Sequence, residues 1–270
     1  MLVLPKTWID RWQGKDIFKE LFALEGRVYR KKRNRKTLRF ALYGRQYFAK
    51  LHHGVGWKEV IKNLLRLRLP VTGAQNESQA IQRLEQLGVK TARLVGYGMR
   101  GWNPARLQSF IITEELASTE SLENFCRDWP TSPPSHALKR ALIIEVAKIA
   151  RRLHGHGINH RDFYICHFLL DISAGRERID PHHLCLYLID LHRMQIHRRI
   201  SRRWRVKDIA ALYFSSMEIG LTQRDLLRFV RVYGNKHLEV SLEEDKAFWR
   251  QVKRRGLALH RRFLRKSERY

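Results

Sequence analysis

Cysteine is scarce in this chain, and the few that occur follow no metal-binding pattern. The 270 residues include three cysteines, Cys126, Cys166 and Cys185. Their number is odd and no two have a Cys-x-x-Cys spacing, which argues against both a disulfide framework and a zinc site. We therefore expect reduced thiols and a cytoplasmic location.

Long apolar runs are also missing. No window approaches about eighteen uncharged apolar residues, so we expect no segment to span a membrane. The stretch Met1–Lys6 lacks the apolar run of a signal peptide. Peripheral attachment to a membrane face remains compatible with this pattern. A hydrophobic fraction of 44% supports a packed core in a chain long enough for two lobes.

Acidic side chains are half as frequent as basic ones. The chain has 26 Asp and Glu against 53 Lys and Arg, which gives a formal net charge of +27 and a pI near 10.7. Such a charge attracts nucleic acid, an anionic membrane surface, or a phosphorylated or carboxylated substrate. Composition does not choose among these partners.

A glycine-rich phosphate-binding loop is absent from the first part of the chain. In its place, six of the seven residues from Arg30 to Lys36 are basic. We interpret this run either as a solvated loop or as a loop that covers ATP phosphates or an anionic substrate. A second basic stretch, His197–Arg205, is rich in arginine and contains Trp204. Such stretches bind phosphates or nucleic acid, or here an anionic sugar acceptor.

The first part of the chain also contains a strand with a lysine near its end. Alternating apolar residues, a turn at Tyr43–Gln46 and the returning strand Tyr47–Leu51 predict a hairpin that carries Lys50. Two more strands are expected around residues 93–97 and 109–113. The segment after the last of these, including Glu114 and Leu116, is typical of a hinge whose backbone binds adenine.

A helix over residues 76–88 is predicted next, with Asn76 as its N-cap and Gly88 as its stop. Glu77 then falls in the first turn, where an acid stabilises the helix dipole. In a kinase-like lobe the same Glu would instead pair with Lys50, which holds the nucleotide phosphates. An earlier basic amphipathic helix over 57–69 is explained by core packing or by contact with an anionic bilayer.

The most informative stretch is Asn159–Leu170, which reads as a polar loop between a long helix capped by Ser135 and an apolar strand. It contains His160-Arg161-Asp162 and His167, and a later apolar strand ends at Asp190. An isolated Asp at a strand end is usually a turn or cap residue. Here the spacing favours a kinase-like phosphotransferase, in which one Asp receives the acceptor proton and the other ligands hold metal.

Asp208, near the start of a later helix, has two interpretations. It either caps that helix and interacts with its dipole, or it ties down the backbone of the loop around Asp162, as in protein kinases.

These segments resemble the lipopolysaccharide core heptose(I) kinases, the RfaP/WaaP family. The resemblance covers nearly the whole chain. It is carried by Asn159–Leu170, Ile61–Leu65, Ser109–Leu116, Ile189–Arg193, Leu212–Met217 and Ile219–Asp225.

The resemblance implies an α+β, two-lobed protein-kinase-like fold. A small antiparallel-sheet lobe (residues 1–116) would bind ATP, and a mainly helical lobe (117–270) would be catalytic. The implied reaction is in-line transfer of the γ-phosphate of ATP, with Mg²⁺, to a hydroxyl of the first heptose of the lipopolysaccharide inner core.

The resemblance also assigns site residues. The expected roles are: catalytic base or hydroxyl-positioning residue, Asp162; metal ligands, Asp190 and His167; ATP-orienting pair, Lys50 and Glu77; adenine hinge, Glu114 and Leu116. His167 stands where these kinases usually have an Asn. Because a neutral imidazole is a softer ligand than Mg²⁺ prefers, His167 either binds the metal or positions a phosphate.

The implied acceptor is a lipid-anchored saccharide bearing phosphates and acidic sugars. We therefore expect a peripheral protein on the cytoplasmic face of the inner membrane, and no nucleic-acid partner. An acidic protein such as an acyl carrier protein is a further possible partner. The alternatives are a related kinase acting on Kdo or on protein tyrosine, a non-catalytic basic binding module, and a nucleic-acid-binding protein.

Overall fold

The computed structural model describes residues 1–32, 35–54, 73–103 and 106–267. The chain divides into two compact units. The first unit comprises Met1–Gln86, Thr91–Leu116 and Leu191–Arg193, and the second comprises Leu87–Lys90, Ala117–Asp190 and Met194–Tyr270. The helix expected over 57–69, with the Ile61–Leu65 segment of the family resemblance, lies outside the described residues.

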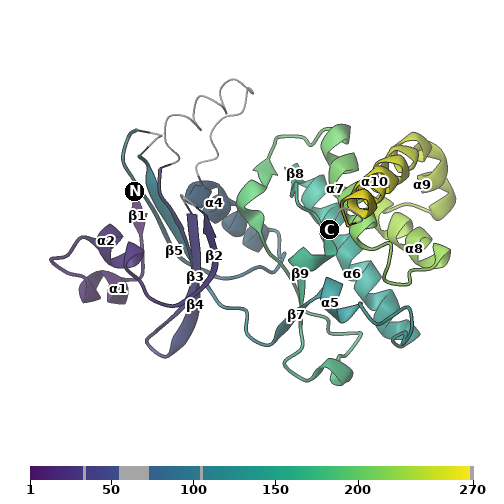
Figure 1. The fold of residues 1–270 in the computed structure, drawn as a ribbon. Helices are drawn as coiled ribbons and strands as arrows, with labels where there is room; N and C mark the ends of the chain where they lie inside the picture. The colour runs from purple at the N-terminus through teal and green to yellow at the C-terminus, as the bar shows by residue number, and fades with distance from the viewer. Residues whose placement is uncertain (33–34, 55–72, 104–105, 268–270) are drawn as a thin grey trace. The chain divides into compact units, whose positions relative to one another are not determined.

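The first unit is built on a six-stranded antiparallel sheet in the order β1-β5-β6-β4-β3-β2 (Figure 1). The strands are β1 (Leu2–Val3), β2 (Arg27–Lys32), β3 (Arg35–Leu42), β4 (Arg45–His52), β5 (Leu94–Arg100) and β6 (Gln108–Glu114). Tyr43 and Gly44 join β3 to β4 and both have positive φ, as a tight hairpin turn requires. The predicted hairpin is thus confirmed.

The basic run from Arg30 to Lys36 was wrongly interpreted as a loop. Residues 30–32 belong to β2 and residues 35–36 to β3, which pair in register Lys31↔Lys36; residues 33–34 are not described. Because β2 is an edge strand of the sheet, its charged side chains oppose pairing with another chain. These charges also hide the alternation by which a strand is recognised in a sequence.

Helices cover both faces of this sheet. On one face, α1 (Lys6–Arg11) and α2 (Ile17–Phe22) complete a buried core. Trp8 lies edge-on to Tyr47 at a centroid distance of 5.1 Å and to Phe40 at 6.0 Å. On the other face, α4 (Gly73–Gln86) packs against β4, β5 and β6. This packing brings α4 against the strand that carries Lys50.

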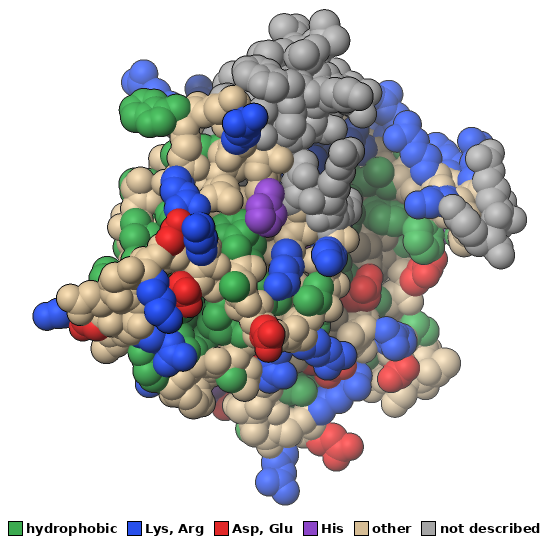
Figure 2. All heavy atoms as spheres, turned by 60° about the vertical axis from the view of Figure 1, so that its left-hand side comes forward, with side chains coloured by type: hydrophobic (Ala, Val, Ile, Leu, Met, Phe, Trp, Pro, Cys, Tyr) green, Lys and Arg blue, Asp and Glu red, His purple; other side chains and the backbone are tan. Residues whose placement is uncertain are grey.

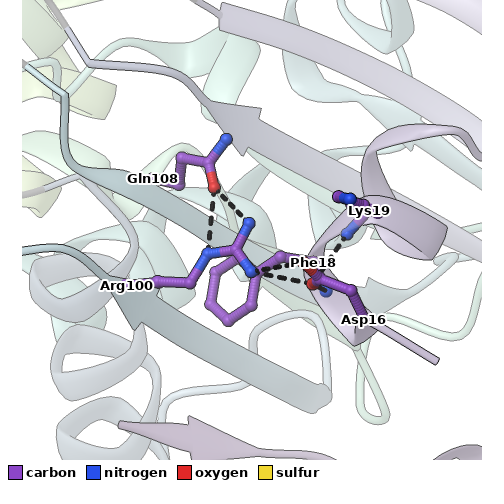
Figure 3. Close-up of polar contacts among 5 residues, drawn as sticks. All are labelled: Asp16, Phe18, Lys19, Arg100 and Gln108. Carbon is purple, nitrogen blue, oxygen red and sulfur yellow. Dashed lines mark hydrogen bonds and ion pairs between the residues drawn. The ribbon is translucent and has the colours of Figure 1, made fainter. Parts of the chain in front are cut away.

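One polar cluster fixes α2 to the sheet (Figure 3). The Asp16 side chain caps α2 by accepting backbone N–H bonds from Phe18 and Lys19 at 3.0 and 3.2 Å. Arg100, at the end of β5, donates to both Asp16 oxygens at 2.8 and 2.7 Å and to Gln108 of β6. The Arg100 hydrogen bond holds the pKa of Asp16 below its ordinary value.

The second unit is mainly helical. Its helices are α5 (Leu122–Phe125), α6 (His136–Gly155), α7 (Arg202–Ser215), α8 (Gln223–Gly234), α9 (Leu238–Glu244) and α10 (Lys246–Ser267). Short strands form two small sheets: β7 (Thr119–Ser121), β9 (Phe168–Asp171) and β10 (Leu186–Leu188) in one, β8 (Ile158–Asn159) and β11 (Gln195–Ile196) in the other. Ser135 caps α6 as predicted, accepting from the Leu138 N–H at 3.2 Å.

The surface carries its positive charge broadly. On the face seen in Figure 2, Lys and Arg side chains are scattered among hydrophobic and acidic ones. Within the described residues, no helix combines the length and the apolar character needed to cross a bilayer.

Candidate active site

The first unit brings Lys50 and Glu77 together. Lys50 lies on β4, and its Nζ is 2.5 Å from Oε1 of Glu77 on α4. Glu77 is only 4% exposed, and its second oxygen, Oε2, has no hydrogen-bond partner among the described residues. A buried carboxylate requires such a pairing, since an unpaired charge is strongly destabilising there.

The start of this helix was misplaced in the sequence interpretation. The helix α4 already includes Gly73, so Asn76 is not its N-cap and Glu77 is not in its first turn. The Asn76 side chain instead donates a hydrogen bond to the carbonyl oxygen of His192 at 3.0 Å. Dipole stabilisation therefore does not explain Glu77, whereas its ion pair with Lys50 does.

The hinge candidates lie at the end of β6, with Glu114 as its last residue and Leu116 two residues later. The Glu114 N–H donates to the Arg93 carbonyl at 2.9 Å, and its carboxylate faces Arg93 and Arg45 at 3.4 and 3.5 Å. Leu116 is the last residue of this segment of the first unit. The adenine role of both hinge residues stays a prediction.

In the second unit, the loop that carries Asp162 begins directly after α6. Gly157 has φ +77°, and a Cβ at this position would lie 2.1 Å from the His197 carbonyl oxygen. Only glycine therefore fits this turn. It allows β8 to pair with β11, with Asn159 opposite Gln195, and so fixes the start of the loop.

Asp208 holds the loop backbone. This residue of α7 is 1% exposed, and its two carboxylate oxygens accept the N–H groups of His160 at 2.7 Å and Arg161 at 2.9 Å. Arg161 has φ +73°, a conformation that costs a non-glycine residue about 1–3 kcal/mol unless its surroundings impose it. The predicted tie from Asp208 to the loop is therefore confirmed, in place of a helix-capping role.

A buried relay fixes Asp208 in turn. His154 is 2.8 Å from the Tyr233 hydroxyl through Nδ1 and 3.4 Å from Asp208 through Nε2. Arg205 donates to the same hydroxyl at 3.0 Å. Burial raises the pKa of Tyr233 to about 12, so its protonated hydroxyl can donate to His154, whose Nε2–H then faces Asp208. His154 thus links Tyr233 of α8 to Asp208 of α7.

His160 connects the loop to the strand end at Asp190. Its Nε2–H donates to the Ile189 carbonyl at 3.1 Å, and the Ile189 N–H donates to the His167 carbonyl at 2.9 Å. Burial lowers the pKa of His160, so the ring is neutral. Both backbone groups of Ile189 are thereby fixed directly before Asp190, which itself has φ +62°.

His167 and Asp190 face each other. His167 Nδ1 lies 2.6 Å from the Asp162 carbonyl oxygen, and Nε2 lies 3.7 Å from Asp190 Oδ2. Because a carbonyl oxygen only accepts, Nδ1 carries a proton, and Nε2 is the ring atom that faces the carboxylate. The two groups are thus placed so that one cation could be bound by both.

This donor set fits Mg²⁺ better than zinc. Within the described residues there is no group of three or more His, Cys, Asp or Glu that could enclose a metal ion. Magnesium seldom needs one, because it binds through one or two carboxylates together with substrate phosphates and water. Cys166 is not a further ligand, because burial raises the pKa of its thiol to about 11 and keeps it protonated.

Sequence reasoning named Asp162, His167 and Asp190, and one of the residues that hold them, Asp208. It assigned no supporting role to His160, His154, Tyr233 or Ser215, whose hydroxyl accepts the Ile165 N–H at 3.0 Å. The partners of Asp208 and His154 lie 47 to 79 residues away in the chain.

Comparison with known proteins also indicates a kinase. The family model described as "Lipopolysaccharide kinase (Kdo/WaaP) family" matches residues 19–233. The chain belongs to this family. The resemblance inferred from the Asn159–Leu170 stretch is thus confirmed.

Two curated relatives in the Kdo/WaaP family align over nearly the whole chain. Both are named lipopolysaccharide core heptose(I) kinase WaaP. The Escherichia coli protein is 47% identical over 99% of this chain and 100% of its own length. The Pseudomonas aeruginosa (strain PAO1) protein is 48% identical over 97% of this chain and 96% of its own.

A solved structure confirms the predicted fold class for this family member. It is described as WaaP in complex with acyl carrier protein, and it matches with a TM-score of 0.82 and 43% sequence identity. The match covers 96% of this chain and 99% of the solved one. The α+β architecture, with an antiparallel-sheet unit and a mainly helical unit, is therefore that of a WaaP kinase.

Proposed function

We propose that this protein is an ATP-dependent sugar kinase. It transfers the γ-phosphate of ATP in line to a hydroxyl of the first heptose of the lipopolysaccharide inner core. The observation that carries the proposal is the loop of the second unit, in which Asp208 fixes the backbone at Asp162 and His160 fixes the strand end at Asp190. The choice of heptose as the acceptor is supported by the similarity of the chain, over nearly its full length, to heptose(I) kinases.

The two units divide the work. We assign ATP binding to residues 1–116 and catalysis to residues 117–270. In the first, Lys50 would bind the nucleotide phosphates while Glu77 holds its ammonium group in place, and the backbone of Glu114 and Leu116 would bind adenine.

Asp162 would accept the proton of the attacking heptose hydroxyl. Its backbone carbonyl is already bound by His167, and its neighbour Arg161 is held by Asp208, so the carboxylate is presented by a fixed main chain. A prepositioned base needs no reorganisation as the hydroxyl reacts.

Asp190 and His167 Nε2 are the groups that would hold Mg²⁺. When bound, the ion neutralises charge on the transferring phosphoryl group. The protonated Nδ1 of His167 leaves Nε2 as the ligand atom, and the hydrogen bond from Nδ1 to the loop backbone orients it.

The ion pair of the first unit makes a testable prediction. Replacing Glu77 with Gln removes the charge that orients Lys50, so we expect the KM for ATP to rise about tenfold, equivalent to about 1.4 kcal/mol, with acceptor KM unchanged. Steady-state kinetics with varied ATP measures this. Glu85→Gln, on an exposed position of the same helix, is the control; equal KM values for the two variants would exclude the assigned role of Glu77.

The acceptor explains the excess of positive charge. A lipid-anchored saccharide with phosphates and acidic sugars lies at an anionic membrane surface, and scattered Lys and Arg side chains (Figure 2) raise its local concentration. This attraction decays over a Debye length of about 8 Å at physiological salt. We place the protein peripherally on the cytoplasmic face of the inner membrane, without nucleic acid as a partner.

An acyl carrier protein is a further proposed partner. The second unit contains a cavity of about 610 Å³, within the size range of small-ligand sites. Apolar side chains of α6, α8 and α10 line it, among them Leu142, Ile143, Leu226, Phe229 and Val252. An acyl chain would gain about 0.8 kcal/mol for each buried methylene there.

Filling this cavity should weaken that partnership. Leu226→Trp introduces a ring into the cavity, and we expect the fraction of protein that co-elutes with acyl carrier protein to fall at least fivefold. Leu257→Trp, at an exposed position of α10 that does not line the cavity, is the control. Co-elution equal to the unmodified protein in both variants would remove the cavity from the proposal.

Transfer of labelled γ-phosphate from ATP to purified inner-core glycolipid tests the reaction itself. Label in the glycolipid supports the proposal. Label on protein tyrosine would point to the other kinase class, and ATP binding with no transfer to any acceptor would point to a non-catalytic binding module.

A further inference from the structure

Two positively charged side chains contact the ring of Trp204 in the second unit. Lys207 Nζ lies 3.9 Å from the centre of the Trp204 ring, and the Arg161 guanidinium carbon lies 5.4 Å from it. Both distances are within the range of cation–π contact. The charges of Arg203 and Arg255 act on Lys207, and we call these four basic residues together with Trp204 the Trp204 cluster.

The packing of two helices forces these charges together. Trp204 and Lys207 lie one turn apart on α7, and Arg203 and Lys207 are four residues apart, a spacing at which like charges repel. Arg255 comes from α10 and precedes Gly256, where an added Cβ would lie 2.5 Å from Tyr213 of α7. The two helices therefore approach closely at the point where Arg255 joins the cluster.

Three members of the cluster have no acidic partner at ion-pair distance among the residues that the structure describes. By contrast, two other cations of the second unit share an acidic partner: Lys139 and Arg228 lie 3.1 and 2.9 Å from Asp225. No ion pair joins Arg203, Lys207 or Arg255 to a carboxylate within the part of the chain that the structure describes. The indole ring orients cations but removes none of their charge, and the oxygens of nearby Asp208 accept the loop N–H groups.

The electrostatics of Lys207 agree with this geometry. Burial lowers its pKa, and the neighbouring charges of Arg203, Arg255 and Arg161 lower it further, while a smaller effect of Asp208 raises it. An anion bound among these groups would relieve the repulsion.

Resting on the proposed function, we propose that the Trp204 cluster binds an anionic group, carboxylate or phosphate, of the acceptor saccharide. The cluster begins at Arg161, the residue before Asp162, and Arg161 shares its fixed backbone with the catalytic loop. Binding a charged substituent here would orient the saccharide so that a neighbouring hydroxyl meets Asp162. The cluster would thereby select acceptors that carry an anionic group, a selection that Asp162 and Asp190 do not make.

A matched pair of double variants tests the site. Arg203→Gln/Arg255→Gln removes two cluster charges, and Arg202→Gln/Arg254→Gln removes the same charge from neighbouring exposed positions of the same helices. With inner-core glycolipid, we expect the acceptor KM to rise at least tenfold in the cluster variant and less than twofold in the control, with kcat and the KM for ATP unchanged in both. Equal acceptor KM values would overturn the proposal.

The source of the anion is then identified with modified acceptors. One modified glycolipid has its phosphates removed, and the other has its carboxyl groups reduced. The glycolipid that lacks the recognised group should bind the unmodified protein more weakly than native glycolipid does. The cluster variant should bind that modified glycolipid and native glycolipid with equal affinity. The modification that produces this pattern names the group; if neither does, the cluster is not an acceptor site.

Acceptor binding is also measured without ATP, so that the two proposals fail separately. If the unmodified protein binds glycolipid but transfers no phosphate, and the cluster variant binds more weakly, the anion site stands and the kinase assignment falls. If transfer occurs and both double variants bind alike, the kinase assignment stands and the site falls.

Discussion

Asp162→Asn should abolish most turnover while leaving the protein folded. An Asn side chain has nearly the size of Asp but cannot accept the proton of the heptose hydroxyl, so kcat should fall about 10²- to 10⁴-fold. The hydrogen bond from His167 is to the backbone carbonyl of residue 162 and survives the substitution. Phosphate transfer to inner-core glycolipid at saturating ATP measures the effect.

Two comparisons make the Asp162 result specific. Asp171→Asn removes another carboxylate of the same unit, one that accepts the Ser173 N–H at the end of β9, and should leave kcat within twofold. The KM for ATP should be unchanged in Asp162→Asn, because ATP binding is assigned to Lys50 and Glu77. A kcat in Asp162→Asn equal to that of the unmodified enzyme would remove Asp162 from the mechanism.

Asp208→Asn should affect both stability and rate. Its carboxylate accepts the N–H groups of His160 and Arg161, and hydrogen bonds to a charged group contribute about 1.5–3 kcal/mol each. The Asn amide can accept only through its one oxygen, and its NH₂ group would face a second buried N–H. We expect the free energy of unfolding to fall by about 3 kcal/mol and kcat to fall about 100-fold, because the loop backbone at Asp162 is released.

The control for Asp208→Asn is the same substitution at Asp16 of the first unit, whose carboxylate also accepts two backbone N–H groups. Asp16 accepts two backbone N–H groups at the start of α2 and binds Arg100 (Figure 3). Asp16→Asn should therefore lower stability without lowering kcat, as urea unfolding and transfer assays would measure. If Asp208→Asn lost stability but kept its kcat, the loop tie would be structural only.

The sequence could predict much of this site because its chemistry is local. The His160–Asp162 triplet, His167 five residues after Asp162, and Asp190 at a strand end needed only one loop and one hairpin between them. The structure places His167 Nε2 3.7 Å from Asp190. Lys50 and Glu77 also meet, since a strand and the next described helix pack face to face.

Apart from the tie from Asp208 to the loop, the supporting contacts could not be predicted because they join distant segments. Tyr233 lies 79 residues after His154, and no periodicity indicates that the two side chains meet. Asn76 looked like a helix cap because its residue type favours that position. The helix nevertheless includes Gly73, and Asn76 binds the His192 backbone instead. The role of Asn76 is thus set by a tertiary contact and not by its local helix-capping preference.

The most direct test of the account is to locate the transferred phosphate. Inner-core glycolipid is phosphorylated by the purified protein with ATP and Mg²⁺, and the saccharide is analysed by phosphorus–proton correlation NMR. The account predicts one new phosphate monoester on the first heptose, absent with Asp162→Asn. A phosphate on Kdo, or none on the saccharide while ATP is consumed, would contradict it.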